Sequence, residues 1–211
     1  MLRKVFNICV RCYNSAFSFL FYLACGGEST FRRRCVKFAS LTSGDRILDV
    51  CCGTGELTTV IARQVYTGRV VGVDTSGSAL DMARAKSGRI PVTLVKASGD
   101  SLPFRSSGFD RCFISLGLHH MPTEGRQKAL AESHRVLAPK GTLHVIDYNL
   151  PERGIRRLAT IVSVKLDQSK EASEMLRTGK LITEIRRAGF NIARRRLTCQ
   201  GMVQLLEMVK K

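Results

Sequence analysis

The sequence predicts an α/β protein built on a doubly wound sheet of seven strands, mostly parallel, with an antiparallel terminal strand. Three observations lead to this fold class. Apolar runs of strand length alternate with longer amphipathic segments of helix length. The first two runs end in acids, Asp49 and Asp74, at the strand ends where such sheets bind ligands. The last two strand candidates are joined at Gln200 and Gly201, which is typical of an antiparallel hairpin at a sheet edge.

The individual elements follow from periodicity and from turn residues. Strands are predicted at residues 46–51, 70–74, 91–96, 109–116, 142–148, 190–198 and 202–209. Helices are predicted at residues 30–41, 56–66, 76–86, 122–137 and 178–188. Thr75 and Ser76 are suitable N-cap residues, and Pro122 suits a first helical position. Pro139 to Gly141 should form the turn that leads into the fifth strand.

The length of the chain suits one compact domain. The 211 residues, 44% of them hydrophobic, are enough for one sizeable core. We expect an N-terminal helical cap segment at residues 1–42 and a domain at residues 43–211 that carries the sheet. Residues 151–175 begin with an apolar helical pattern and continue into a polar stretch, 167–174, that is expected to be a loop or mobile cap.

The formal net charge of +17 implies attraction to anionic surfaces such as a bilayer, a nucleic acid or an acidic partner. The arginine runs at 32–34, 156–157, 186–187 and 194–196 are interpreted as solvated faces. Aromatic residues are not interleaved with these runs, so a stacking platform for nucleic acid is not indicated. Basic helices beside apolar segments favour a cytoplasmic enzyme in peripheral contact with the anionic inner face of a membrane. The sequence is silent on oligomeric state.

The N-terminal stretch, Met1 to Cys25, is basic and free of acids. Its apolar run at 16–25 is shorter than the roughly 20 residues that span a bilayer. We interpret it as a structural or membrane-surface helix, although a basic, acid-poor start is also typical of a mitochondrial transit peptide. Cys9 and Cys12 have C-x-x-C spacing without a second such pair, so they are expected to be ordinary thiols and no metal site is predicted.

The loop after the first strand carries the most specific signal. Gly53 and Gly55 should leave room for a ligand against bare backbone, and the amides of the following helix face outward as donors. Asp74 ends the next strand, at a spacing that suits an acceptor for the hydroxyls of a ribose. A dinucleotide-binding loop would have a third glycine where this chain has Thr58, so a nicotinamide enzyme is disfavoured.

With these residues in place, the chain resembles a class I S-adenosylmethionine-dependent methyltransferase with a Rossmann-like fold. It is most similar to the ubiquinone/menaquinone-biosynthesis methyltransferase family, over residues 13–211. The resemblance rests on the segments 47–58, 99–104 with Phe109-Asp110, 115–122, 134–143 and 187–190. One departure is Cys51, because the family often has glycine there. A cysteine at this position could narrow the approach of the loop to the cofactor.

The resemblance implies S-adenosylmethionine as cofactor and S-adenosylhomocysteine as product. Asp49, Gly53 and Gly55 would line the methionine and ribose portion, and Asp74 would hold the ribose hydroxyls. Asp100, with Ser101, would meet the adenine, and Ser115 with Leu116 would border the sulfonium. The expected cofactor-binding set is completed by Cys51, Thr54 and Thr75.

Methyl transfer from a sulfonium is a direct displacement, so alignment is the main contribution of the protein. A base is needed only if the acceptor must lose a proton. His119, His120 and Tyr148 lie where an acceptor would sit and are the candidate catalytic residues. Adjacent histidines rarely both do chemistry, so one of them would be catalytic or would orient the substrate. The alternative is a histidine at a helix entry that packs and hydrogen-bonds locally.

The predicted function is methylation of a small, lipophilic acceptor such as a quinol precursor. Two alternatives stay open: an enzyme of the same fold that acts on a phospholipid head group, RNA or protein, and a non-catalytic binding or assembly protein. Intact Gly53, Gly55, Asp74 and Asp100 speak against the non-catalytic alternative. No Asp-Pro-Pro-Tyr or Asn-Pro-Pro-Tyr segment follows the fourth strand, which speaks against methylation of exocyclic base nitrogens.

Overall fold

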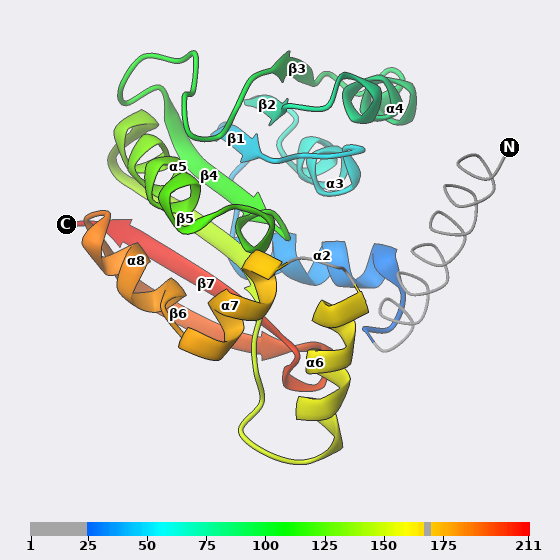
Figure 1. Cartoon of the computed structure of the whole chain (residues 1–211). Coiled ribbons are helices and arrows are strands. Elements are labelled where there is room, and N and C mark those ends of the chain that lie inside the picture. Colours follow the sequence, from blue (N-terminus) through cyan, green and yellow to red (C-terminus); the bar gives the residue numbers. More distant parts are fainter. Residues whose placement is uncertain (1–24, 167–169) are drawn as a thin grey trace, which may run out of the picture.

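One seven-stranded sheet organises the protein in a computed structural model that describes residues 25–166 and 170–211 (Figure 1). The strand order is β3 (Thr93–Lys96), β2 (Arg69–Asp74), β1 (Arg46–Val50), β4 (Phe109–Ser115), β5 (Leu137–Tyr148), β7 (Val203–Lys210) and β6 (Phe190–Thr198). Neighbours from β3 to β5 pair in parallel, whereas β7 runs antiparallel to both β5 and β6. The predicted fold class is therefore confirmed, including the terminal hairpin.

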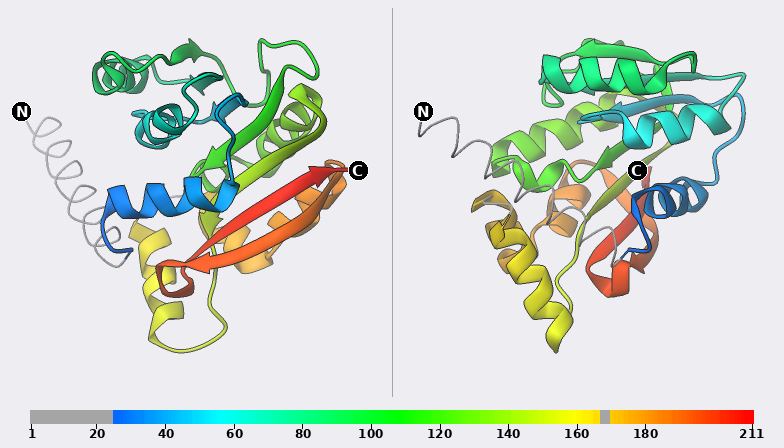
Figure 2. Two further views of the ribbon diagram at one scale, coloured as in Figure 1. Left: turned by 180° about the vertical axis from the view of Figure 1, so that it is seen from behind. Right: turned by 90° about the vertical axis from the view of Figure 1, so that its right-hand side faces the viewer.

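Helices cover both faces of this sheet (Figure 2). They are α2 (Glu28–Ala39), α3 (Glu56–Gln64), α4 (Gly77–Ser87), α5 (Thr123–Val136), α6 (Ile155–Leu166), α7 (Lys170–Thr178) and α8 (Leu181–Arg187), with short turns η1 (Leu118–His120) and η2 (Cys199–Gly201). One core includes Phe31 of α2 and Ile61 of α3. A second core includes Leu130 of α5 and Ile185 of α8. Helix α7 packs on α6 and on η1, next to the carboxyl end of β4.

Local sequence signals explain most of the element boundaries. The Ser76 hydroxyl caps α4 by accepting a hydrogen bond from the Ala79 amide at 3.2 Å, as its residue type predicts. Helix α2 buries Phe31, Cys35 and Ala39 along one face, which is the face that the periodicity predicts. Pro122 is the N-cap of α5 and not its first helical residue.

Two local predictions are wrong. Pro139 to Gly141 do not form a turn outside the strand, because β5 begins at Leu137 and continues through them as an irregularity in its pairing with β4. Lys140 takes up the local change of direction with a φ of 66°. The polar stretch is helical from Lys170, because Ala172 and Met175 of α7 give it a buried side.

A disulfide between Cys25 and Cys199 joins the entry of α2 to the β6–β7 connection, with the two Cα atoms 4.4 Å apart. The sequence did not predict this pair, because the two residues are 174 positions apart and meet only through the fold. The predictions for Cys9, Cys12 and the apolar run before Cys25 concern residues outside the described part of the chain. Within the described part, no helix combines the length and apolarity needed to cross a bilayer.

Candidate active site

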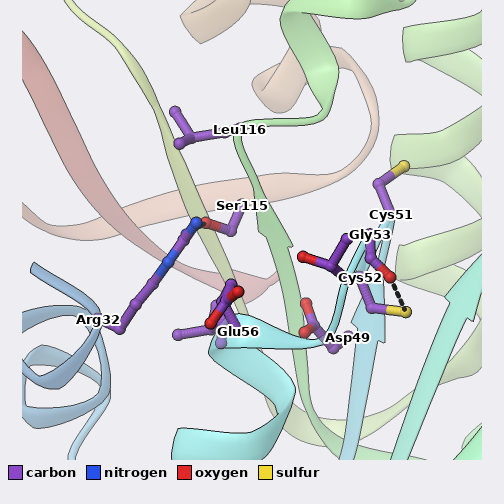
Figure 3. Close-up of a pocket in the computed structure, with 10 residues that line it drawn as sticks. Arg32, Asp49, Cys51, Cys52, Gly53, Glu56, Ser115 and Leu116 are labelled. Atoms are coloured by element: carbon purple, nitrogen blue, oxygen red, sulfur yellow. Dashed lines mark hydrogen bonds between the residues drawn. The ribbon is translucent and has the colours of Figure 1, made fainter. Parts of the chain in front are cut away.

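A cavity of about 230 Å³ lies where the strand order reverses, between the carboxyl ends of β1 and β4 (Figure 3). This is the position where open α/β sheets bind ligands. The cavity is lined by Arg32, Asp49, Cys51, Cys52, Gly53, Thr54, Glu56, Leu57, Ser115 and Leu116. The structure thus brings together six residues of the predicted cofactor-binding set: Asp49, Cys51, Gly53, Thr54, Ser115 and Leu116.

Arg32 of α2 is a site residue that sequence reasoning missed. Its side chain is only 11% exposed, and Nη1 donates a hydrogen bond to the Ser115 hydroxyl at 3.1 Å. Figure 3 shows the side chain extended from α2 toward the end of β4. A second contact, 3.6 Å to Glu28, lies within the same helix. The interpretation of residues 32–34 as a solvated face is therefore wrong for Arg32, because the packing of α2 turns this one arginine inward.

Asp49 supplies the opposite charge on the cavity wall. It is 1% exposed, and its Oδ2 accepts a hydrogen bond from the Thr58 hydroxyl at 2.6 Å. Burial raises the pKa of Asp49 to about 6, while the Thr58 bond and the charge of Arg32 oppose this rise. Its Oδ1 is buried without a hydrogen-bond partner among the described residues. Buried carboxylate oxygens are normally hydrogen-bonded, and the adjoining cavity has room for a ligand that carries the missing hydrogen-bond donor.

A second cavity of about 450 Å³ lies on the other side of the loop after β1 and shares Cys51, Gly53 and Leu116 with the first. It is lined by Cys51, Gly53, Val73, Asp74, Thr75, Ala97, Ser98, Gly99, Leu116, Gly117, His120 and Met121. Asp74 accepts hydrogen bonds from the amides of Gly53 and Ser76, at 2.8 and 2.9 Å. One carboxylate oxygen therefore holds the loop after β1 and the other holds the start of α4. Each oxygen keeps capacity for a further donor such as a ribose hydroxyl.

Two predicted adenine residues lie beside this cavity and not on its wall. Asp100 and Ser101 are exposed, whereas the two preceding residues, Ser98 and Gly99, line the cavity. The Ser101 amide bonds back to the Ser98 carbonyl at 3.2 Å, which closes a turn. The sequence predicts this loop as the adenine contact, but it could not say which residues of the loop turn toward the cavity.

The two glycines of the loop have different structural roles. A Cβ on Gly53 would meet nothing within 4 Å, so the missing side chain leaves open space. A Cβ on Gly55 would lie 2.8 Å from the Cβ of Ala83 in α4. The expectation that both glycines make room for a ligand thus applies to Gly53, while the missing side chain of Gly55 makes room for α4.

Cys51 occupies a left-handed backbone conformation, with a φ of 59°, that usually favours glycine. A Cβ on Gly117 would be 2.8 Å from the Cβ of Cys51, so the absence of a side chain at Gly117 accommodates the cysteine. Burial is the main cause that raises the pKa of Cys51 to about 12. Its thiol is therefore protonated at neutral pH, which fits a wall residue and not a nucleophile.

The three candidate catalytic residues form one cluster. The ring centroids of His119 and His120 are 4.0 Å apart, and those of His119 and Tyr148 are 4.7 Å apart. His120 lines the second cavity, whereas His119 and Tyr148 are buried. Sequence reasoning missed Asp147, which is fully buried with its Oδ1 2.7 Å from Nδ1 of His119. The available signal was an acid inside the apolar strand at 142–148.

These residues fit S-adenosylmethionine on chemical grounds. The first cavity has a guanidinium and a buried carboxylate on its walls, which together match the carboxylate and the ammonium group of an amino acid. The second cavity offers the Asp74 carboxylate and a broader space suited to a nucleoside. Both meet at Gly53 and Leu116, where the sulfonium would lie.

Comparisons with known proteins agree with this chemistry. A family model described as a methyltransferase domain matches residues 47–141. An uncharacterised methyltransferase of Synechocystis sp. is 31% identical over 86% of this chain and 84% of its own length. A demethylmenaquinone methyltransferase of Lactobacillus johnsonii is also 31% identical, over 64% of this chain and 57% of its own length. The crystal structure of an S-adenosylmethionine-dependent methyltransferase from Aquifex aeolicus shares the fold, with a TM-score of 0.68 and 20% identity over 85% of this chain and 89% of that one.

Proposed function

The chain belongs to the S-adenosylmethionine-dependent methyltransferases, and on this premise we propose that it methylates a small lipophilic acceptor such as a quinol precursor. The observation that carries the proposal is the pair of cavities around Gly53, one suited to an amino acid and one to a nucleoside. The bound cofactor supplies an electrophilic methyl group, and S-adenosylhomocysteine is released.

In this proposal, Arg32 and Asp49 bind the two ends of the amino-acid portion, with Ser115 orienting the guanidinium. Asp74 and Thr75 hold the ribose, and the backbone at Ser98 and Gly99 borders the base. Cys51, Gly53, Thr54 and Leu116 form the walls around the reacting centre. Gly55, Asp100 and Ser101 support these walls from outside.

We assign the acceptor side to the cluster at the ends of β4 and β5. His120 is the candidate catalytic residue, because it lines the second cavity, whereas His119 and Tyr148 are buried. His119, Asp147 and Tyr148 position it: the Asp147 carboxylate fixes His119 through Nδ1, and the His119 ring packs between His120 and Tyr148. His120 would accept a proton from an acceptor hydroxyl as the oxygen becomes nucleophilic.

A lipophilic acceptor is supported by an apolar pocket of about 280 Å³ between α6 and α7. Its walls include Leu150, Ile161, Val164 and Leu176. Helix α7 supplies Leu176 to this pocket and also contacts η1, which carries His119 and His120, so we place the pocket on the acceptor side. The demethylmenaquinone methyltransferase named above supports the same substrate class, although the chain matches little more than half of that protein. The charge of +17 further suits work at an anionic membrane.

The test is methyl transfer from S-adenosylmethionine labelled in its methyl group. Demethylated quinols, phosphatidylethanolamine vesicles, RNA and a protein extract are offered in parallel. We expect label in the quinol fraction, loss of most of this transfer in His120→Ala, and little change in His134→Gln, a histidine outside the cluster. Label in head groups, RNA or protein alone would replace the quinol proposal. Tight cofactor binding without transfer to any of them would support a non-catalytic role.

A further inference from the structure

Helix α6 carries large apolar side chains on its outer face as well as on its inner face. Ile155, Leu158 and Val162 are 83%, 61% and 43% exposed. Their spacing of i, i+3 and i+7 places them along one stripe of the helix. Val164 is buried, and Ile161 lines the pocket between α6 and α7. Packing within the protein therefore accounts for the apolar side chains on the inner face of α6, but not for those on its outer face.

This stripe differs from the other exposed apolar residues of the described part of the chain. Tyr66, Met82 and Leu197 are also exposed, but they lie in separate segments of the chain, and single residues of this kind are normal on a protein surface. Figures 1 and 2 show α6 at the end of the molecule that lies away from β1, β2 and β3. Three neighbouring side chains on one helix face instead point to a binding surface.

Basic residues lie at the start of this stripe. Arg153 and Arg156 are exposed, so their charges are available to an outside partner. Arg157 is half-buried and bonds to the Pro151 carbonyl at 3.1 Å, which ties the beginning of the helix to the segment before it. An apolar stripe with arginines at its border is the pattern of a helix that lies in the interface of an anionic bilayer.

We propose that α6 docks this protein onto an anionic phospholipid surface. Ile155, Leu158 and Val162 enter the boundary between head groups and acyl chains, and Arg153 and Arg156 bind lipid phosphates. The net charge of +17 gives the long-range attraction that a basic docking surface needs.

The location of the stripe deepens the proposed function, on which this part of the inference rests. The same helix that would touch the bilayer contributes Ile161 and Val164 to the apolar pocket beside the acceptor site. A lipophilic acceptor could therefore pass from the membrane to the pocket along α6 with little exposure to water. The docking itself does not depend on which acceptor is methylated.

The absence of tryptophan from the chain allows a direct test. Leu158→Trp places one fluorophore in the stripe, and Tyr66→Trp places one at an exposed apolar position elsewhere. With vesicles of phosphatidylcholine and phosphatidylglycerol, we expect Leu158→Trp to shift its emission to the blue and to be quenched by brominated lipid. Tyr66→Trp should do neither, and vesicles of phosphatidylcholine alone should give a much weaker response. Emission from Leu158→Trp that is blue-shifted without vesicles and unchanged by them would overturn the proposal, because another copy or residues 1–24 would then cover the stripe.

Vesicle flotation of the full chain gives the second test. The triple variant Ile155→Ser, Leu158→Ser, Val162→Ser should bind anionic vesicles about tenfold more weakly or worse. The matched variant Tyr66→Ser, Met82→Ser should bind like the wild type. Unchanged cofactor affinity would show that the triple variant is folded. Equal flotation of all three proteins, or none of the wild type, would contradict docking through α6, while methyl transfer to a soluble short-chain quinol reports separately on the proposed function.

Discussion

At the scale of single residues, the proposed function assigns the amino-acid portion of the cofactor to Arg32 and Asp49. They come from α2 and β1, and both line the first cavity, so in the proposed function each faces one end of a zwitterion. Both charges are largely buried, and a charge-assisted hydrogen bond to either of them is stronger because water is excluded.

Arg32→Gln should weaken S-adenosylmethionine binding by about 10- to 100-fold, the range for loss of a hydrogen bond to a charged group. Binding of 5′-methylthioadenosine, which lacks the amino-acid carboxylate, should stay unchanged. Titration calorimetry with both ligands makes the comparison, and Arg33→Gln is the control because Arg33 is exposed on the same helix. An equal loss for both ligands would show that Arg32 acts on the fold and not on the carboxylate.

The raised pKa of Asp49 predicts a pH dependence of cofactor binding. The ammonium group of the cofactor favours the ionised carboxylate, so affinity should fall as pH drops through about 6, by up to about tenfold per pH unit. Asp49→Asn should bind more weakly at pH 8 and lose this dependence, which calorimetry across pH 5–8 would measure. A wild-type profile that is flat between these values would place the ammonium elsewhere.

In the free protein, the contribution of Asp49 to folding stability changes with pH in the opposite direction to the cofactor affinity. Because the pKa of Asp49 is higher in the folded state than its ordinary value of 3.8, its contribution to stability is fully present below that value. It is lost as pH rises through about 6. Because the cofactor binds more tightly when Asp49 is ionised, bound cofactor should stabilise the fold more at pH 8 than at pH 5.

At the scale of elements, the loop between β1 and α3 has two roles: it borders the cavities, and it packs against helix α4. Gly53 faces open space, and Gly55 allows α4 to approach through Ala83. The disulfide from Cys25 to Cys199 anchors the chain just before α2, the helix that carries Arg32. The position of Arg32 thus depends on how α2 is held by the fold.

Gly55→Ala should lower the free energy of unfolding by about 2–4 kcal/mol, because a left-handed backbone and a close contact with Ala83 both oppose the added methyl group. Gly53→Ala should cost only about 1–2 kcal/mol, since its backbone is also left-handed but its surroundings are open. Urea unfolding of the two variants and the wild type measures these free energies of unfolding. Equal losses would mean that the helix contact at Gly55 is not tight.

The pairing of α5 with α8 depends on a buried ion pair. Arg126 and Glu184 are 2% and 3% exposed and share two hydrogen bonds, at 2.8 and 3.0 Å. Glu184→Gln should destabilise the protein by about 3–5 kcal/mol, because it leaves a buried guanidinium without its counter-charge. Denaturant unfolding measures this, with Glu124→Gln in the exposed pair with Lys128 as control. Similar small effects of both substitutions would argue that water reaches Arg126.

The sequence predicts the elements far better than it predicts their contacts. Alternation and capping located nearly every strand and helix, because these signals are local. Arg32, Asp147 and the Cys25–Cys199 bridge were missed because each depends on elements distant in the chain. Helix α7 was missed for a related reason: its polar sequence gains a buried side only when Met175 meets the rest of the fold.

At the scale of the whole molecule, the proposed cofactor site and the apolar pocket lie on different elements. The cofactor cavities adjoin the loops after β1, β2 and β4, and the apolar pocket lies between α6 and α7. Helix α2 supplies Arg32 to the first cavity, while α6 presents an apolar stripe to the outside. Cofactor from the aqueous phase and acceptor from a bilayer could therefore reach the site from different directions.

The most direct test of this account is a crystal structure of the full chain with bound S-adenosylhomocysteine. We predict that its carboxylate lies against Arg32, its ammonium group against Oδ1 of Asp49, its ribose hydroxyls at Asp74, and its sulfur near Leu116, facing the side of His120. A ligand whose amino-acid portion lies away from both Arg32 and Asp49, or whose ribose does not contact Asp74, would contradict the account.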